Sequence, residues 1–166
     1  MSYELLTLKT NQLNNAIITK ICKLKNTHWK HNLDNQKKFF YNNSKKLDHH
    51  NLLYCKSKLV GYTMLRRRKL YKKKRYLLFD TLIIHKNFRS KGLAKKIMEF
   101  NNLTIKKLNL ISILYCEKNL IKFYKKNSWK LQKFKNRKLN KFVMTFNYDK
   151  FFNIKLNRSI VENADL

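Results

Sequence analysis

Hydrophobic and polar positions along the chain change their period several times, and each change predicts a new element. Residues 3–8 alternate weakly, which predicts a short first strand. A helix follows, for which Thr10 is the expected N-terminal cap. The apolar face of this helix is formed at helical spacing by Leu13, Ile17, Ile21 and Leu24.

A second N-terminal helix is expected from Asp34, the next residue that suits a cap. Lys37 stands where a capping box would need Glu or Gln, so Asp34 is a single cap signal. One face of this helix is marked by Phe40, Ser44 and Leu47.

Strand patterns dominate the middle of the chain. Residues 52–55 and 59–65 are apolar runs joined by Lys56-Ser57-Lys58, which predicts a hairpin. Gly61 lies inside the second run, where we expect a bulge or close packing. Residues 76–84 are almost continuously apolar, as in a central strand that is covered on both faces.

The last third of the chain alternates between strands and helices. A helix is predicted from about Leu93, a buried strand over 110–116, a short helix over 118–127 and a last strand over 141–148. This order predicts an α/β fold of the α+β type, with a single mixed, mostly antiparallel twisted sheet flanked by helices and containing a βαβ unit.

Length and composition fit one domain. We assign residues 1–148 to it and 149–166 to a polar C-terminal extension. A hydrophobic content of 43% argues against disorder, and no apolar run is long enough to predict a membrane span. No secretory signal is visible, and three cysteines without a CxxC pair predict neither a disulfide framework nor a metal site. We therefore expect a cytoplasmic protein.

The formal net charge of +30 suggests a nucleic-acid partner at first sight. However, the excess consists of 32 Lys against 7 Arg, and it accompanies abundant Asn, Ile, Phe and Tyr with two glycines and no proline. An AT-rich genome explains this whole pattern, so nucleic acid is the alternative partner and not the favoured one. The densest basic runs, 66–69 and 72–75, are expected at a solvated hairpin tip.

Gly92 lies where the predicted strand 76–84 leads into the next helix. The start of a helix offers unpaired N–H groups and partial positive charge, and a small residue there lets a diphosphate approach the backbone. Lys91, Lys95 and Lys96 add charge. Neither a Walker loop nor GxGxxG is present, and an ordinary turn is the simpler interpretation of Gly92 by itself.

Two motifs change that interpretation. The stretch 82–97, with Arg89, Gly92 and Ala94, resembles the acetyl-CoA-binding motif of the GNAT superfamily of N-acetyltransferases. The stretch 116–129 is similar to the second motif of that family at Asn119, Phe123 and Tyr124, whereas Ser128 and Trp129 stand where Gly and Phe are usual. The resemblance covers about residues 3–148.

The resemblance implies transfer of an acetyl group from acetyl-CoA, as co-substrate and without a metal, to an amine acceptor. It implies that Tyr124 protonates the departing thiolate and that Asp80 accepts the amine proton; core packing of Tyr124 and a structural role for Asp80 are the alternatives. Asn119 would brace the pantetheine or the neighbouring strand. The implied coenzyme-binding residues are Leu82, Ile83, Ile84, Arg89, Ser90, Lys91, Gly92, Leu93, Ala94, Lys95 and Asn119.

Other candidates are weaker. His85 follows the central strand and could act as a base, but a histidine in a turn is more often solvated. His49, His50 and Cys55 lack a fourth metal ligand at sensible spacing. The acceptor amine does not follow from the sequence, because a fold and a cofactor do not fix it. A monomer or a homodimer would fit, and a catalytically silent, nucleic-acid-binding relative of the fold is the alternative function.

Overall fold

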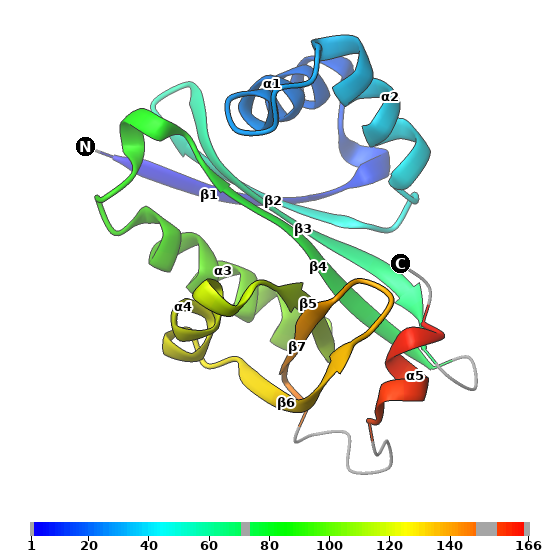
Figure 1. The fold of residues 1–166 in the computed structure, drawn as a ribbon. Coiled ribbons are helices and arrows are strands. Elements are labelled where there is room, and N and C mark those ends of the chain that lie inside the picture. The colour runs from blue at the N-terminus through cyan, green and yellow to red at the C-terminus, as the bar shows by residue number, and fades with distance from the viewer. Residues whose placement is uncertain (1, 71–73, 149–155, 165–166) are drawn as a thin grey trace. The chain divides into compact units, whose positions relative to one another are not determined.

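A computed structural model describes residues 2–70, 74–148 and 156–164 (Figure 1). The strands are β1 (Tyr3–Lys9), β2 (His49–Cys55), β3 (Lys58–Lys69), β4 (Arg75–Ile84), β5 (Ser112–Cys116), β6 (Lys130–Asn136) and β7 (Lys141–Phe146). The helices are α1 (Asn15–Asn26), α2 (Leu33–Asn43), α3 (Leu93–Lys107), α4 (Ile121–Lys126) and α5 (Arg158–Glu162). Short 3₁₀ turns are η1 (Thr10–Gln12), η3 (Lys86–Phe88) and η4 (Lys118–Leu120).

The seven strands form one mixed sheet in the order β1-β2-β3-β4-β5-β7-β6. Antiparallel pairing joins β1 to β2, β2 to β3, β5 to β7 and β6 to β7. The pair β4–β5 is parallel, as a βαβ unit requires. The expected fold class, with a mostly antiparallel sheet and β4 at its centre, is therefore confirmed.

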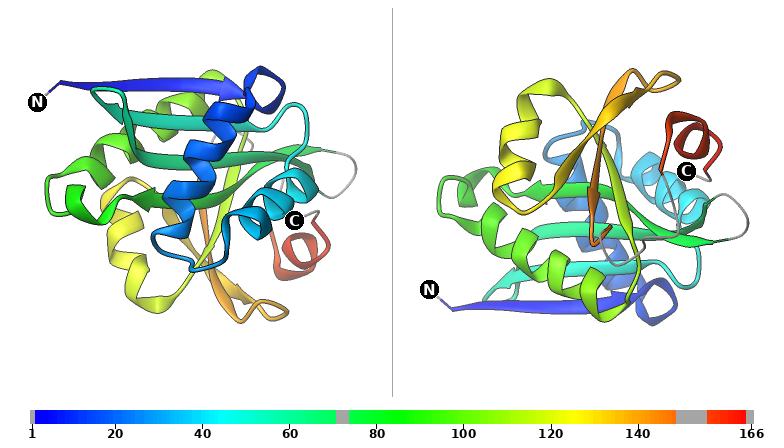
Figure 2. Two further views of the ribbon diagram at one scale, coloured as in Figure 1. Left: turned by 90° about the horizontal axis from the view of Figure 1, so that it is seen from above. Right: turned by 90° about the horizontal axis from the view of Figure 1, so that it is seen from below.

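By its contacts, the chain divides into two compact units. The first contains Met1–Arg66 and Thr81–Asn101, and the second contains Arg67–Asp80 and Asn102–Leu166. In the first unit, α1 and α2 lie over one face of β1, β2 and β3 (Figures 1 and 2).

The first unit has a hydrophobic core on each face of its strands. Leu52 and Ile83 pack with residues of α1 and α2, including Ile21 and Phe40. Their chain neighbours Leu53 and Ile84 pack instead with Leu93 and Ile97 of α3. Consecutive strand residues point to opposite faces, and both faces here are covered. This explains why residues 52–55 of β2 and most of residues 76–84 of β4 are apolar and do not alternate with polar residues.

The second unit has its own core beneath α5. Tyr76 and Leu78 of β4 pack there with Ile113 of β5 and Val143 of β7. Three residues after position 149 complete this core: Leu156, Val161 and Ala164. The parallel pairing of β4 and β5 covers Leu77↔Ser112 and Leu78↔Ile113, although both strands continue beyond these pairs.

Both expected helix caps are wrong by a few residues. Asn14 caps α1, because its side chain accepts a hydrogen bond from Ile17 N at 2.9 Å, whereas Thr10 begins η1. Asn32 caps α2 by accepting from Asn35 N at 2.8 Å. Asp34 lies in the first turn of α2, where a carboxylate still interacts favourably with the helix dipole.

Three further expectations need correction. The helix α2 ends at Asn43, so Ser44 is its C-terminal cap and Leu47 lies beyond it, 41% exposed. Strand β6 was not predicted from the sequence. The basic run 66–69 belongs to β3 and is not a solvated tip, because Arg66 and Arg68 are 6% and 3% exposed. Lys72 and Lys73 lie outside the described residues.

All three cysteines are buried and free. Within the described ranges, no helix has the length and apolar character needed to cross a membrane.

Candidate active site

The turn between β4 and α3 is built around Gly92. This residue has a φ of 73°, in the left-handed region that glycine adopts without strain. A Cβ added there would meet no atom within 4 Å, so the space in front of the turn is open. Gly61 differs, since a Cβ would lie 2.9 Å from Ile84 Cδ1, which matches the close packing expected there.

The first hydrogen bond of α3 runs from Lys96 N to Gly92 O at 3.1 Å. The N–H groups of Leu93, Ala94 and Lys95 therefore precede the helical ladder and remain available to an anion. The turn residues Arg89, Ser90, Lys91, Gly92 and Lys95 are exposed, Ala94 is half-buried, and Leu93 is buried. This end of α3 thus presents backbone donors and basic side chains at the surface.

Arg89 and the end of β4 are joined directly. The Nε–H of Arg89 donates to Ile84 O at 3.1 Å, which holds the exposed side chain against the strand end. Ile83 and Ile84 turn their side chains into the two cores of the first unit, and Leu82 is half-buried. The side chains of Ile83 and Ile84 are therefore not accessible to a ligand. A ligand at this strand end could contact only the backbone N–H and C=O groups of these two residues.

His85 has a structural role in this turn. Its Nδ1 accepts a hydrogen bond from Asn87 N at 3.3 Å and caps η3. Partial burial, and then the charges of Lys58, Lys86 and Arg89, lower the pKa of its imidazole. The neutral ring suits this acceptor role.

In the second unit, Tyr124 lies on α4 within a group of aromatic rings. Its ring centroid is 6.2 Å from that of Phe79, 6.3 Å from Trp129 and 5.2 Å from Phe123. Burial, and to a smaller degree the nearby Cys116, raises the pKa of Tyr124 to about 12. Within the described part of the chain, its hydroxyl makes no hydrogen bond. This phenol is therefore protonated at neutral pH, and its O–H can donate to a ligand.

The turn after α4 fixes the backbone around Tyr124. Both Asn127 N and Trp129 N donate to Tyr124 O, at 3.0 and 3.1 Å. Ser128 between them has a φ of 68°, which is the conformation that glycine favours. Ser128 thus adopts the backbone conformation of the glycine that is usual at this place in the second GNAT motif, so the turn forms without that glycine.

Asp80 and Asn119 are both exposed. Asp80 lies in β4 between the buried residues Phe79 and Thr81. The strand is buried, as expected, but this position is open to solvent, so the carboxylate is accessible to a substrate. Asn119 lies in η4, the turn that leads into α4.

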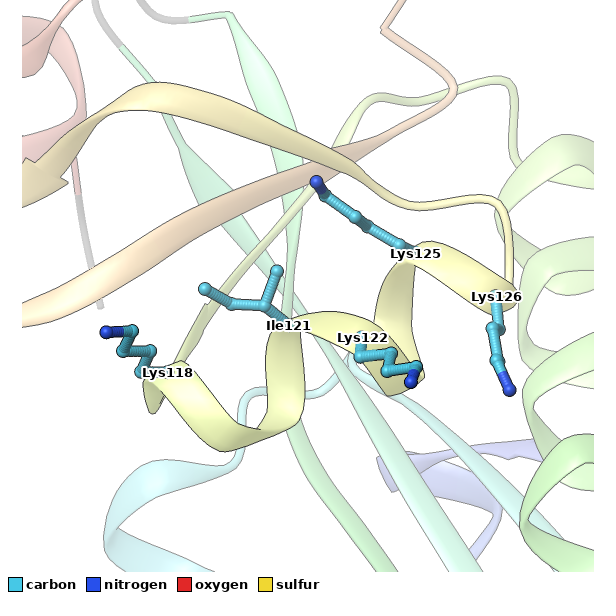
Figure 3. A pocket seen from close by; sticks show the side chains of 5 residues that line it. All are labelled: Lys118, Ile121, Lys122, Lys125 and Lys126. Carbon is cyan, nitrogen blue, oxygen red and sulfur yellow. The ribbon is translucent and has the colours of Figure 1, made fainter.

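A concavity of about 620 Å³ follows the outer side of α4 (Figure 3). Figure 3 shows its lining side chains extending from the helix. It is lined by Lys118, Ile121, Lys122, Lys125 and Lys126. The sequence analysis missed this surface, although the spacing of the four lysines predicts one helical face. An anionic group is the ligand that such a surface would attract.

His50 is a core residue whose two ring nitrogens are occupied. Its Nδ1 lies 2.8 Å from Tyr62 Oη and its Nε2 2.9 Å from Thr10 Oγ1. Burial is the main reason why its pKa falls to about 3. Across the described ranges, no three His, Cys, Asp or Glu side chains gather closely enough to hold a metal ion.

No protein-family model and no curated protein matches the sequence. Solved structures do match the fold. An acyl-CoA N-acyltransferase from Pseudomonas aeruginosa is 12% identical with a TM-score of 0.69, over 87% of this chain and 99% of that one. An N-acetyltransferase from Thermoplasma acidophilum in complex with coenzyme A is 17% identical with a TM-score of 0.61, over 88% and 99%.

The ribosomal-protein-S18-alanine N-acetyltransferase from Escherichia coli is also similar. It is 10% identical with a TM-score of 0.63, over 86% of this chain and 93% of that one. At such identities the likeness concerns the fold.

Proposed function

We propose that this chain, which has the fold of the acyl-CoA N-acyltransferases, transfers an acetyl group from acetyl-CoA to a primary amine. The observation that carries this proposal is the open turn at Gly92, where backbone donors begin a long helix beside basic side chains. The coenzyme A bound to the Thermoplasma acidophilum enzyme of the same fold supports it.

The turn of the first unit would hold the coenzyme. N–H groups of residues 90–95 donate to the pyrophosphate, and the positive end of α3 stabilises its charge. Backbone groups of Leu82, Ile83 and Ile84 hydrogen-bond the pantetheine arm and the acetyl carbonyl. Arg89, which is tied to Ile84 O, stabilises the conformation of the turn.

Two side chains of the second unit would move protons. The neutral amine attacks the thioester carbonyl carbon, and Asp80 accepts the amine proton directly or through water. The C–S bond then breaks, and the O–H of Tyr124 gives its proton to the sulfur. A phenol with a pKa of about 12 stays protonated until that moment. Asn119 braces the pantetheine or its neighbouring strand.

Coenzyme binding is the first test of this proposal. Gly92→Asp should abolish binding of coenzyme A in calorimetry, because it places a carboxylate against the diphosphate. Gly92→Asn is the matched control, since Asn has the same size, tolerates a positive φ and carries no charge. Equal and full binding by both folded variants would refute the site. An acceptor screen that detects released thiol then identifies the amine.

The alternative function is a basic nucleic-acid-binding module, and the lysine-lined concavity of α4 is the observation in its favour. It predicts sequence-tolerant binding with a steep dependence on salt. Tight RNA or DNA binding at 150 mM salt by a protein that does not bind coenzyme A would select this function.

A further inference from the structure

Two lysine side chains, those of Lys58 and Lys91, lie over the ring of Phe88, beside the Gly92 turn. Lys58 Nζ lies 5.8 Å and Lys91 Nζ 5.5 Å from the centre of this ring. Lys86 and Arg89 flank Phe88 in the same turn. The ring packs against the core formed by α3 and the strands of the first unit, so it is an anchored platform. We call these five residues the Phe88 cluster.

The Phe88 cluster joins two segments that are distant in sequence. Lys58 is the first residue of β3, whereas the other members of the cluster follow β4. A backbone hydrogen bond from His85 N to Val60 O, 2.8 Å long, holds the two segments side by side. Partial burial is the main reason why the pKa of the His85 imidazole is lowered, and the nearby charges of Lys58, Lys86 and Arg89 lower it further.

Among the residues that the structure describes, no acidic side chain forms an ion pair with this cluster. Lys95 pairs with Glu99, and Lys141 pairs with Glu117, and neither ion pair involves a residue of the Phe88 cluster. The two lysine ammonium groups are at most about 11 Å apart, which is the sum of their distances from the ring centre. The two ammonium groups repel each other at this distance. An anion that binds between them is attracted to both and offsets that repulsion.

Coenzyme A carries a second anionic group besides its pyrophosphate. Its 3′-phosphate is a monoester with a charge of about −1.5 to −2 at neutral pH. In the proposed binding mode, the N–H groups of the Gly92 turn donate hydrogen bonds to the pyrophosphate. None of these groups binds the 3′-phosphate, which therefore needs a partner elsewhere. Flexible lysines act as point charges, which suits a terminal phosphate.

We propose that Lys58 and Lys91 bind the 3′-phosphate of the coenzyme, so that this protein distinguishes coenzyme A from its 3′-dephospho form. The inference rests on the proposed function, since it requires that the coenzyme binds at the Gly92 turn. Lys58 is then a specificity residue supplied by the β2–β3 hairpin.

The test compares Lys58→Gln with Lys56→Gln. Both changes remove one exposed lysine charge from the β2–β3 hairpin, Lys56 in its turn and Lys58 at the start of β3. Of the two, only Lys58 lies over the Phe88 ring. Calorimetry at low salt measures the binding of coenzyme A and of dephospho-coenzyme A. We expect the unaltered protein to bind coenzyme A about tenfold more tightly, as one charge-assisted contact provides. Lys58→Gln should lose most of this preference and bind the dephospho form as before.

Several outcomes would overturn the inference. They are equal affinity of the unaltered protein for the two ligands, an equal loss for both ligands in Lys58→Gln, and the same loss of preference in Lys56→Gln. Lys122→Gln tests the other lysine surface, which lies along α4. If this variant, and not Lys58→Gln, lost the preference for coenzyme A over its dephospho form, the 3′-phosphate would bind at α4. If the unaltered protein binds neither ligand, the proposed function itself fails.

Discussion

The indole Nε1–H of Trp129 donates to Asn102 Oδ1 at 3.0 Å, and the same amide donates through Nδ2 to Asn127 O at 2.9 Å. Asn102 lies in α3, so one side chain of this helix fixes both the tryptophan and the turn after α4. Trp129 is 2% exposed, and its rings contact Phe79 and Phe146. The position of Tyr124 depends on this anchor because its carbonyl accepts from Trp129 N.

Trp129→Phe should therefore destabilise the protein. The phenylalanine fills less of the core and leaves Asn102 Oδ1 without its donor, which costs roughly 1–3 kcal/mol. The free energy of unfolding in urea measures this loss. Trp29→Phe is the control, since Trp29 is 39% exposed and its replacement should cost little.

Tyr124→Phe removes one O–H and almost no volume. If this phenol protonates the thiolate, turnover should fall by about 10²–10³-fold while coenzyme affinity stays similar. Tyr115→Phe is a matched control, because Tyr115 is another tyrosine of the second unit whose pKa burial raises to about 12. Unchanged turnover in Tyr124→Phe, with only a shift in melting, would assign Tyr124 to the core.

Asp80→Asn keeps the size of the side chain and removes its ability to accept a proton. We expect a reduced rate that recovers as pH rises, because more of the acceptor amine is then already neutral. A pH–rate profile measures this, with Asp34→Asn, another exposed acid, as the control. A loss that does not depend on pH and accompanies a lower melting temperature would make Asp80 structural.

Acid should destabilise the first unit through His50. Its pKa is about 3 in the folded protein, against 6.5 for an ordinary histidine, so between these limits the unfolded chain binds a proton that the folded chain does not. Stability therefore falls as pH drops below about 6, by up to roughly 1.4 kcal/mol per pH unit. Urea unfolding from pH 7 to pH 4 measures the slope. His50→Gln should flatten it, and the exposed His28→Gln should not.

Ser128→Gly should stabilise the turn after α4. Glycine adopts the φ of 68° without the cost of about 1 kcal/mol that a Cβ brings, although its greater freedom in the unfolded chain offsets part of the gain. A net gain of roughly 0.5 kcal/mol would raise the melting temperature by about 1–2 °C. Ser57→Gly, whose φ is not positive, should bring no such gain; a rise in both variants would contradict the explanation.

The sequence predicted the parts of the fold that local patterns determine. The run 76–84 lies in β4, and Gly92 directly precedes α3, because a strand buried on both faces and a left-handed glycine each leave a clear signal. The two motifs identified the fold although no family model matches the sequence.

The missed features depend on tertiary contacts. Asn14 and Asn32 displaced Thr10 and Asp34 as caps, since several residues of the same capping type stand close together and chain packing selects among them. Strand β6 is an edge strand with polar residues and a register shift near Leu131, so its pattern resembles that of a loop. Arg66 and Arg68 are buried because β3 extends farther than its apolar run.

The burial of all three cysteines bears on how turnover can be followed. Burial raises the pKa of Cys116 to about 11 and that of Cys22 above its usual value. Protonated and inaccessible thiols react slowly with disulfide dyes, because the thiolate is the reactive form. A colorimetric reading of free thiol should thus report released coenzyme with little background from the protein. Without substrate no coenzyme is released, so a slow rise of the thiol signal would come from cysteines that unfolding exposes. Its size would then measure the fraction of unfolded protein.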